Sequence, residues 1–433
     1  MPELQPTLQP LWLPGTVDAD ERSTEVLSVY EGLFCDGTRK LHTDVVVGLH
    51  GSSQQHRVLS IHQEVRRQNT VQRMRDDTCY RLLTEASIPV GSLGRGAGQT
   101  VAADAFTDRE LSATARHVGR ADVVLSLDEQ PLALLNAASL AGTPVIVCLH
   151  RTDPHSDAGA LAHLQEAISS GRLAAGICCA EATKAAYMEA GIPGSLLHVI
   201  PNGVRPQLFR PDPERRAVVR RELGIPPEAP LIVLAARYDP VKNVPLFLRA
   251  ARLHLGHAPE AHAVMCGAGM GPANADLHDE MATAFADRPD LLRRLHPIGL
   301  RTDMHHVYAA CDVVALTSTS EAAPLALIEG MMCGAVPVTT DVGDSASIVE
   351  GYGLVTPSEP QAIDAAWAEA VSLRARAAGV APPHIRDRFS QSRMLSSYRA
   401  LIDRVVHESP VLRPRTGMQP DAVPGRGLPV RTS

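Results

Sequence analysis

The sequence lacks the cysteine patterns that hold small or zinc-binding domains together. Its eight cysteines are scattered over 433 residues, with Cys178 next to Cys179, and no Cys-x-x-Cys pair occurs. Neither a disulfide framework nor a structural zinc site is therefore indicated. Because cysteines stay reduced in the cytosol, we expect a cytoplasmic protein.

The sequence also has little that resembles a signal peptide or a membrane span. The start, MPELQPTLQPLWLPG, has no basic region and is interrupted by proline. The most apolar long segment, 132–149, contains Asn136, Gly142 and Pro144, and this pattern predicts a helix, a turn and a buried strand. We therefore expect no integral membrane segment.

An excess of positive charge is also absent. The chain has 41 lysines and arginines against 48 aspartates and glutamates, a net charge of −7. Such a chain has no general attraction for nucleic acid or anionic lipid, so no nucleic-acid partner is expected. Its length is sufficient for two domains of ordinary size.

Short apolar runs and amphipathic segments alternate from Glu25 onward. This alternation predicts an α/β protein with parallel sheets and helices on both faces. In the first half, strands are expected at 25–34, 56–62, 88–93, 121–127, 144–150, 176–180 and 197–201, and helices at 68–85, 108–118, 132–141 and 158–170, with one more after the loop 35–40.

A proline-rich, charged stretch at 205–216 separates two series of alternating elements. The second series has strands at 231–236, 262–267, 296–300, 312–316 and 336–340. These patterns predict a flexible N-terminus at 1–24, a first domain at 25–204, a linker at 205–216, a second domain at 217–384, an amphipathic helix at 385–407 and a disordered tail at 408–433.

The most informative stretch is 312–338, which predicts a strand, a loop, a helix and a second strand. Pro324 suits the first position of the helix, because its φ is already helical and its missing N–H is not needed there. Glu321 lies in the loop and Glu329 on the second helical turn, so both border the crevice at the strand's carboxyl end. The free amides of Leu325 and Ala326 would attract an anion to the same crevice. A nucleotide sugar, anionic and rich in hydroxyls, fits this combination.

Two cations, Arg237 and Lys242, follow the first strand of the second domain. They are expected at the same crevice as the two glutamates. An arginine grips phosphate oxygens as a fork and a lysine adds a point charge, so the pair suits a diphosphate. The alternative is two solvated surface cations.

Glu321 and Glu329, with seven residues between them and Pro-Val following, resemble the donor-site motif of family 4 retaining glycosyltransferases of the GT-B fold. The resemblance covers roughly residues 25–407. It implies two Rossmann-like doubly wound domains that face an interdomain cleft, with the acceptor on the first domain and the donor on the second. It assigns Glu321 to the transferred sugar, Glu329 to the nucleotide ribose, and Arg237 with Lys242 to the diphosphate.

The resemblance also extends to three weaker segments. The turn with Gly267 and Gly269 matches a Gly-rich turn near the nucleotide, although a plain turn is the alternative. Gly37 and Thr38 lie where the family has a Gly-Gly loop near the donor phosphate. His150 matches a position near the reacting sugar, and the alternative is a structural histidine at a strand end.

The central motif departs from the family at one point. Where the family commonly has Gly-Phe-Gly after the first glutamate, this chain has Ala322, Ala323 and Pro324. Proline cannot donate a backbone hydrogen bond. Sugar contacts made by this loop must therefore come from Ala322, Ala323 or Leu325.

The resemblance implies a retaining transferase of the hexosyltransferase type that moves a sugar from a nucleoside diphosphate sugar, with UDP or GDP favoured, to an acceptor hydroxyl. The only Asp-x-Asp, Asp18 and Asp20, lies in the expected loose N-terminus. We therefore expect no metal and no cofactor. A small acceptor such as a cyclitol or an amino sugar is the hypothesis.

Three other functions compete with sugar transfer. A non-hydrolysing nucleotide-sugar epimerase of the same fold would turn over without an acceptor. A nucleotide-sugar binding protein would bind the donor without turnover. An NAD-dependent oxidoreductase is disfavoured, because Gly267 and Gly269 lack the third glycine of a dinucleotide-binding fingerprint.

Overall fold

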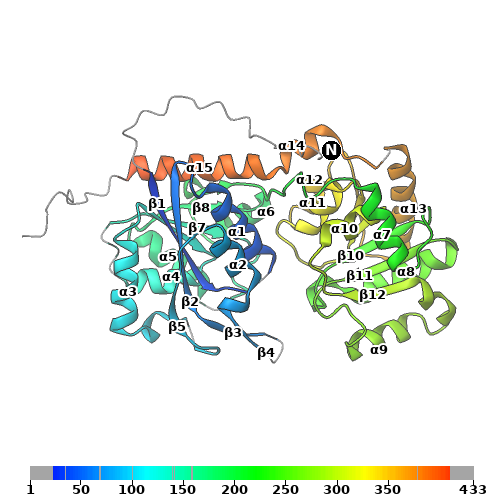
Figure 1. The fold of residues 1–433 in the computed structure, drawn as a ribbon, viewed down its shortest axis with the longest axis horizontal. Coiled ribbons are helices and arrows are strands. Elements are labelled where there is room, and N and C mark those ends of the chain that lie inside the picture. Colours follow the sequence, from blue (N-terminus) through cyan, green and yellow to red (C-terminus); the bar gives the residue numbers. More distant parts are fainter. Residues whose placement is uncertain are drawn as a thin grey trace, which may run out of the picture.

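Two parallel sheets organise the chain, and each consists of short apolar runs that are buried on both faces. The structure is a computed structural model that describes residues 23–409 except 35, 68–69, 100, 139, 141, 158 and 378. The predicted flexible N-terminus and disordered tail lie almost entirely outside these residues. The two sheets belong to separate domains that lie side by side (Figure 1).

The first domain contains seven parallel strands in the order β5-β2-β1-β6-β7-β8-β9. The strands are β1 (Thr24–Gly32), β2 (Gln54–His62), β5 (Val90–Arg95), β6 (Val123–Leu127), β7 (Val145–Leu149), β8 (Leu173–Cys178) and β9 (Leu197–Val199). One face of the sheet is covered by α1 (Gly37–Leu49), α2 (Thr78–Glu85) and α15 (Gln391–Glu408). The other face is covered by α3 (Asp108–Val118), α4 (Pro131–Ala137), α5 (Ala160–Ser169) and α6 (Glu181–Glu189).

The second domain contains six parallel strands in the order β12-β11-β10-β13-β14-β15. The strands are β10 (Leu231–Ala235), β11 (His262–Cys266), β12 (Leu295–Gly299), β13 (Val313–Leu316), β14 (Val336–Thr340) and β15 (Leu354–Thr356). Helices α8 (Val244–His257), α9 (Ala275–Ala284) and α13 (Pro360–Arg376) cover one face. The other face is covered by α7 (Pro213–Glu222), α10 (Met304–Ala310), α11 (Leu325–Met332), α12 (Ser345–Val349) and α14 (Pro383–Arg388).

Both strand orders reverse direction at one point, between β1 and β6 and between β10 and β13. A doubly wound sheet binds ligands outside the carboxyl ends of its strands at such a switch point. Short 3-10 turns complete the fold: η1 (Met74–Asp76), η2 (Ala103–Ala105), η3 (Gly194–Leu196), η4 (Pro240–Lys242) and η5 (Pro289–Arg294). Among the residues described, none of the helices is both long and apolar enough to span a bilayer.

The helix predicted at 68–85 is wrong for its first half. An antiparallel hairpin of β3 (Glu64–Arg67) and β4 (Thr70–Arg73) occupies this region, and the helix begins only at Thr78. Asp77 explains the late start, because its carboxylate accepts hydrogen bonds from the amides of Cys79 and Tyr80 and so caps the helix.

The helix predicted at 385–407 is divided into α14 and α15. The backbone of Val204, where the chain leaves the first domain, accepts from the amide of Gln391 and donates to the carbonyl of Phe389. These two bonds occupy backbone groups that a continuous helix would need. Helix α15 then packs on the first domain, so the chain crosses between the domains twice at one place (Figure 1).

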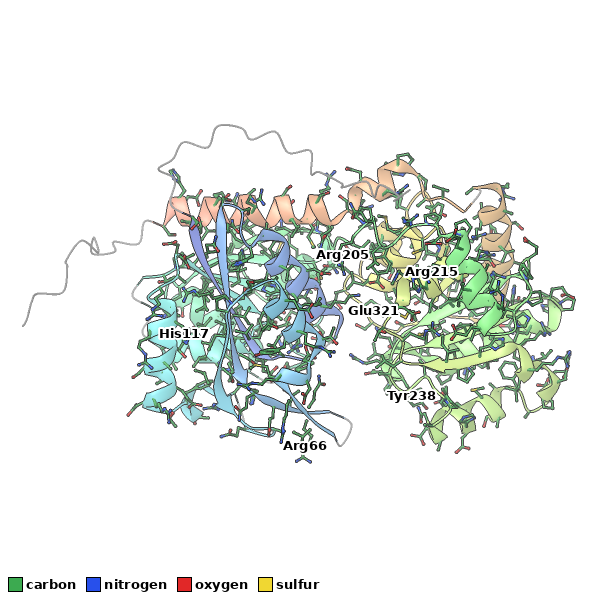
Figure 2. The ribbon with its side chains drawn as sticks, viewed as in Figure 1. Arg66, His117, Arg205, Arg215, Tyr238 and Glu321 are labelled. Atoms are coloured by element: carbon green, nitrogen blue, oxygen red, sulfur yellow. The ribbon has the colours of Figure 1, made fainter. Side chains whose placement is uncertain are left out.

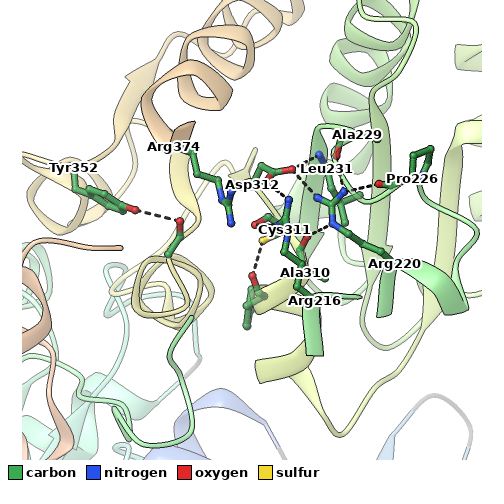
Figure 3. Close-up of polar contacts among 12 residues, drawn as sticks. Arg216, Arg220, Pro226, Ala229, Leu231, Ala310, Cys311, Asp312, Tyr352 and Arg374 are labelled. Atoms are coloured by element: carbon green, nitrogen blue, oxygen red, sulfur yellow. Dashed lines mark hydrogen bonds and ion pairs between the residues drawn. The ribbon is translucent and has the colours of Figure 1, made fainter. Parts of the chain in front are cut away.

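A buried carboxylate, that of Asp312, attaches α7 to the second sheet (Figure 3). It lies 2.8 Å from a guanidinium nitrogen of Arg216, 2.8 Å from one of Arg220 and 3.0 Å from one of Arg374. It also accepts a 2.8 Å hydrogen bond from the amide of Leu231. The first residues of α7 lie in the stretch predicted as linker, yet this helix belongs to the second domain through these contacts.

We expect Asp312→Asn to destabilise the second domain by about 3–5 kcal/mol, because three guanidinium groups lose their buried counter-charge. Urea unfolding followed by far-UV circular dichroism measures the loss. Asp287→Asn is the matched control, since Asp287 pairs with Arg252 at the surface and is half exposed. Equal midpoints for the two variants would contradict a structural role for the Asp312 cluster.

Candidate active site

A cavity of about 450 Å³ lies between the two domains and is lined by both. It is lined by Asp36, Gly37, Thr38, Leu41, His150, Cys179, Asn202, Ala235, Ala236, Arg237, Lys242, Ala268, Leu300, Leu316, Glu321, Ala322, Ala323, Pro324, Leu325 and Ala326. Most of these residues follow the carboxyl ends of parallel strands. The structure thus brings the residues predicted at 37–38, 150, 237–242 and 321–325 to one cavity.

A larger cavity of about 580 Å³ lies on the second domain between α8, α9 and the start of α13. Arg249, Arg252, Asp279 and Glu280 contribute its charged groups. It contains none of the predicted site residues and no residue of the first domain. The interdomain cavity is therefore the candidate active site.

The Glu321 side chain is fixed by two neighbours at the cavity wall. Its Oε1 accepts a 2.6 Å hydrogen bond from Lys242 Nζ and a 2.7 Å hydrogen bond from Ser318 Oγ. Glu321 is labelled at the boundary between the domains in Figure 2. The sequence predicted Glu321 and Lys242 as separate groups, whereas the structure joins them in an ion pair.

The loop that carries Glu321 leads into α11, which begins one residue later than predicted. Pro324 is the capping residue with φ −67° and ψ 108°, and the helix starts at Leu325. Leu325 and Ala326 therefore present the first free amides of the helix, and both line the cavity. An anionic group bound there would interact favourably with the helix N-terminus.

Arg237 lies at the open side of the same wall. Its side chain is 55% exposed and donates a 2.9 Å hydrogen bond to Asp239, which also caps η4 through the amide of Val241. The guanidinium keeps donors free toward the cavity, because only one of its nitrogens bonds to Asp239 among the described residues.

Gly267 and Gly269 do not line the cavity, although Ala268 between them does. Gly267 has φ +141°, and a Cβ on it would lie 2.0 Å from the carbonyl oxygen of Ala236. Gly269 has φ +75°, and a Cβ on it would lie 2.8 Å from Tyr238 Cβ. The two glycines allow the loop after β11 to pack against the backbone that carries Arg237.

Glu329 lies beside the main cavity rather than on its wall. It is buried and lines a small adjoining cavity of about 20 Å³ together with Lys40 of the first domain. Lys40 Nζ lies 3.5 Å from Glu329 Oε1. Burial raises the pKa of the Glu329 carboxyl, and the nearby Lys40 ammonium opposes this change. The sequence did not predict this ion pair between the two domains, because Lys40 belongs to none of the motifs.

The first domain contributes the N-terminus of α1 and the end of β7. Asp36 caps α1 by accepting a 2.8 Å hydrogen bond from the amide of Arg39, and this cap places Gly37 and Thr38 at the cavity. His150 Nε2 is buried and has no hydrogen-bond partner among the described residues. Burial lowers the pKa of His150 to about 4, so the ring is neutral near pH 7.

Two buried carboxylates lie behind His150, at the end of β6. Glu129 is fully buried, accepts a hydrogen bond from Tyr187 and lies 3.9 Å from Arg151. Asp128 is also buried, has φ +62°, and its Oδ1 has no partner among the described residues. Burial raises the pKa of Asp128 to about 6, opposed mainly by Arg39 and Arg151. Asp128 and Glu129 directly follow the strand predicted at 121–127, but they belong to no motif, so the sequence did not single them out.

Several further contacts were missed by the sequence. Asn202 and Thr152 of the first domain bond to the loop that carries Glu321, and Asp344 bonds back to the first domain at α6. Asn202 lies in the segment IPNGV, directly after the strand predicted at 197–201. Within the described residues, no group of three or more His, Cys, Asp or Glu side chains is placed to hold a metal ion.

Two family models match the chain in succession. The model described as Glycosyltransferase Family 4 matches residues 81–208, and the model described as Glycosyl transferases group 1 matches residues 216–380. The chain belongs to glycosyltransferase family 4. The first match covers the first domain from α2 onward, including His150, and the second covers most of the second domain, so each match includes residues that line the cavity.

Curated relatives of this family 4 chain are similar over part of their length. EpsF of Bacillus subtilis, named as a glycosyltransferase, is 28% identical over 252 residues, which are 56% of this chain and 62% of the relative. The D-inositol 3-phosphate glycosyltransferase of Thermobispora bispora is 28% identical over 237 residues, 51% of this chain and 54% of the relative. The chain thus spans less than two thirds of the length of these relatives.

Solved structures show that this member of family 4 has the GT-B fold. The structure of HepE from Anabaena in complex with UDP and glucose superposes with a TM-score of 0.71 at 20% identity, covering 88% of this chain and 100% of that chain. The sucrose-phosphate synthase of Thermosynechococcus elongatus superposes with a TM-score of 0.67 at 15% identity, covering 90% and 100%. The predicted doubly wound domains facing a cleft are therefore confirmed.

Asp128 provides a test of the electrostatics on the first domain's side. Its folded pKa of about 6 lies above its ordinary value of 3.8, so the folded carboxyl holds its proton between these values. The cost of burying the charge is therefore absent below pH 3.8, appears as the pH rises to 6, and is complete above 6. Arg39, Arg151, Asp36 and Glu31 are the charged groups that act on it.

We expect Asp128→Asn to gain stability over the wild type as the pH rises, by about 2–3 kcal/mol between pH 4 and pH 8. Asparagine tolerates the left-handed backbone at this position, so the variant should fold. Urea unfolding at both pH values measures the change. If the difference in unfolding free energy between Asp128→Asn and the wild type does not vary between pH 4 and pH 8, Asp128 is charged over this whole range.

Proposed function

We propose that this chain transfers a sugar from a nucleoside diphosphate sugar to an acceptor hydroxyl, with retention of configuration at the anomeric carbon. The observation that carries the proposal is the arrangement around Glu321, whose carboxylate is held by Lys242 beside the free amides at the start of α11. A carboxylate for sugar hydroxyls and donors for phosphate oxygens then share one cavity. HepE, which has been solved with UDP-glucose bound, supports such a donor.

The difficult step is departure of the nucleoside diphosphate. The bond between the anomeric carbon and the phosphate oxygen breaks, and its electron pair goes to that oxygen. Arg237, Lys242 and the amides of Leu325 and Ala326 would stabilise the growing negative charge. The acceptor oxygen bonds to the anomeric carbon from the face that the leaving group departs, and its proton passes to the leaving phosphate oxygen.

The other predicted residues have binding roles in this proposal. Glu329 would hold the nucleotide ribose, for which Lys40 must release its carboxylate. Gly267 and Gly269 act through the backbone that they position. Neutral His150 offers an unpartnered ring nitrogen to a sugar hydroxyl. Gly37 and Thr38 would approach the donor phosphate from the first domain.

The acceptor that we propose is a small molecule such as a cyclitol or an amino sugar. Relatives named D-inositol 3-phosphate glycosyltransferases support a small polyol acceptor. On the first domain's side, Arg39 pairs with Asp36 and Arg151 pairs with Asp157, and neither arginine lines the cavity.

We expect one of UDP-, GDP-, ADP- or TDP-glucose to raise the thermal midpoint, because a ligand at a hundred times its Kd stabilises by about 2.7 kcal/mol. The donor so selected is then incubated with myo-inositol and glucosamine, and the product's anomeric configuration is read by NMR. We propose that no metal or cofactor takes part, so excess EDTA should leave transfer unchanged.

Other outcomes of this experiment would indicate another function or contradict a part of the proposed mechanism. Epimerised donor without acceptor would indicate the epimerase, and binding without turnover would indicate a binding protein. Transfer that EDTA abolishes and Mg²⁺ or Mn²⁺ restores would disprove metal independence. An inverted anomeric carbon would disprove retention.

Arg237→Ala should lower the single-turnover rate at saturating donor about a hundredfold, because loss of a preorganised charge at a developing anion costs about 3 kcal/mol. The rate of Arg237→Lys should lie between those of the wild type and Arg237→Ala, since lysine keeps the charge and loses the forked geometry of the guanidinium. Arg288→Ala is the matched control, because Arg288 makes the same contact with the second residue after it, Asp290, away from the cavity. A wild-type rate for Arg237→Ala would show that Arg237 is only a surface cation.

A further inference from the structure

Three consecutive carbonyl groups of the loop that carries Glu321 all accept hydrogen bonds. The Glu321 carbonyl accepts from Thr152 Oγ1 at 3.3 Å, and the Ala323 carbonyl accepts from Asn202 Nδ2 at 3.1 Å. The Ala322 carbonyl between them accepts from the amide of Asp344 at 3.0 Å. Two of the three donors thus belong to the first domain, although the loop belongs to the second.

These bonds determine the direction in which the loop's amides point. In a planar trans peptide, the carbonyl of one residue and the N–H of the next lie on opposite sides. When Thr152 holds the carbonyl of Glu321, the N–H of Ala322 must point away from Thr152. Likewise, the bond from Asp344 directs the N–H of Ala323. The bond from Asn202 holds the Ala323–Pro324 peptide, which has no N–H, so it fixes the place of the loop rather than the direction of an amide.

The amides so directed are available for a ligand. Ala322, Ala323, Leu325 and Ala326 all line the cavity, and within the described residues their amides make no hydrogen bond. Pro324, in the middle of the series, has no N–H to offer. The loop therefore presents its donors to the cavity and its acceptors to the surrounding protein.

The two first-domain contacts differ in their distance from the interdomain crossing. Asn202 is buried directly before Gly203 and Val204, where a Cβ on Gly203 would lie 2.6 Å from the carbonyl oxygen of Ser390. Thr152 lies instead on the loop after β7. A rotation of the domains about the crossing would therefore change the contact of Thr152 more than that of Asn202.

We propose that Thr152 and Asn202 are positioning residues for the donor sugar: Asn202 holds the Glu321 loop in place, and closure of the domains orients the Ala322 amide through Thr152. This inference rests on the proposed function, because it concerns the same cavity. It explains how the first domain, which carries none of the predicted sugar-binding groups except His150, acts on donor binding. The free loop of an open enzyme would lose the Thr152 bond and with it the fixed direction of the Ala322 amide.

The alternative is that Thr152 and Asn202 only hold the domains together. Asp344 separates the two explanations, because its carboxylate holds the domains together without bonding to a loop carbonyl. Its two oxygens accept from the amides of Glu181 and Ala182 at 2.8 and 2.7 Å. Asp344→Asn weakens this contact and leaves the backbone N–H that bonds to Ala322 in place.

The test compares the Kd of the donor selected by the thermal panel with that of its free nucleoside diphosphate, by calorimetry on the full chain. We expect Thr152→Val and Asn202→Ala to weaken donor binding about five- to tenfold, with nucleotide binding within about twofold of wild type. Thr152→Ser should restore donor binding, because it keeps the hydroxyl. Asp344→Asn should change both affinities by the same factor.

Thr84→Val is the matched control, because the Thr84 hydroxyl also bonds to a backbone carbonyl, that of Tyr80, on α2 away from the cavity. An unchanged ratio of the two affinities in Thr152→Val and Asn202→Ala would overturn the inference. A ratio that falls equally in Asp344→Asn, or that Thr152→Ser does not restore, would also overturn it. If the wild type binds no sugar nucleotide at all, the proposed function itself fails.

Discussion

The second domain depends on the buried carboxylate of Asp312. One acidic side chain stands directly before β13 and holds Arg216 and Arg220 of α7 and Arg374 of α13. Because burying an unpaired charge is costly, these elements can pack only in the arrangement that brings all three guanidinium groups to it. This arrangement fixes the start of β13, and the carboxyl end of the same strand leads to the loop of Glu321. The position of the candidate active site thus depends on a charge cluster at the opposite end of a four-residue strand.

The cavity is formed by two domains that share few elements. The chain passes from the first to the second at Val204 and returns between α14 and α15, where Val204 pairs with Phe389 and Gln391. Such a crossing permits rotation more easily than separation. The ion pair of Lys40 with Glu329 lies beside Val204, and the contact of Asp344 with the start of α6 lies near Phe389, so both reinforce this crossing.

Local patterns in the sequence were sufficient for most of the fold. Runs such as 313–316 and 336–340 are apolar on both faces, which only a covered parallel strand allows, and their order gave two doubly wound domains. The prediction failed at 70–77, where β4 and η1 take the place of a helix, because Asp77 caps the helix only from Thr78. It also missed the break before Gln391, since that break results from pairing with Val204, nearly 190 residues away in sequence.

The sequence by itself determined which residues could meet at the strand ends, because a side chain that follows a parallel strand must lie at the carboxyl edge of its sheet. Arg237, Lys242 and Glu321 could be selected on that basis alone. Only the tertiary structure decided what each one contacts: Lys242 is joined to Glu321, and Glu329 faces Lys40 outside the main cavity. The physical reason is the separation in sequence of the groups that interact. Strand and helix patterns are set by neighbours a few residues apart, whereas these ion pairs and the hydrogen bonds of Thr152 and Asn202 join segments that only folding brings together.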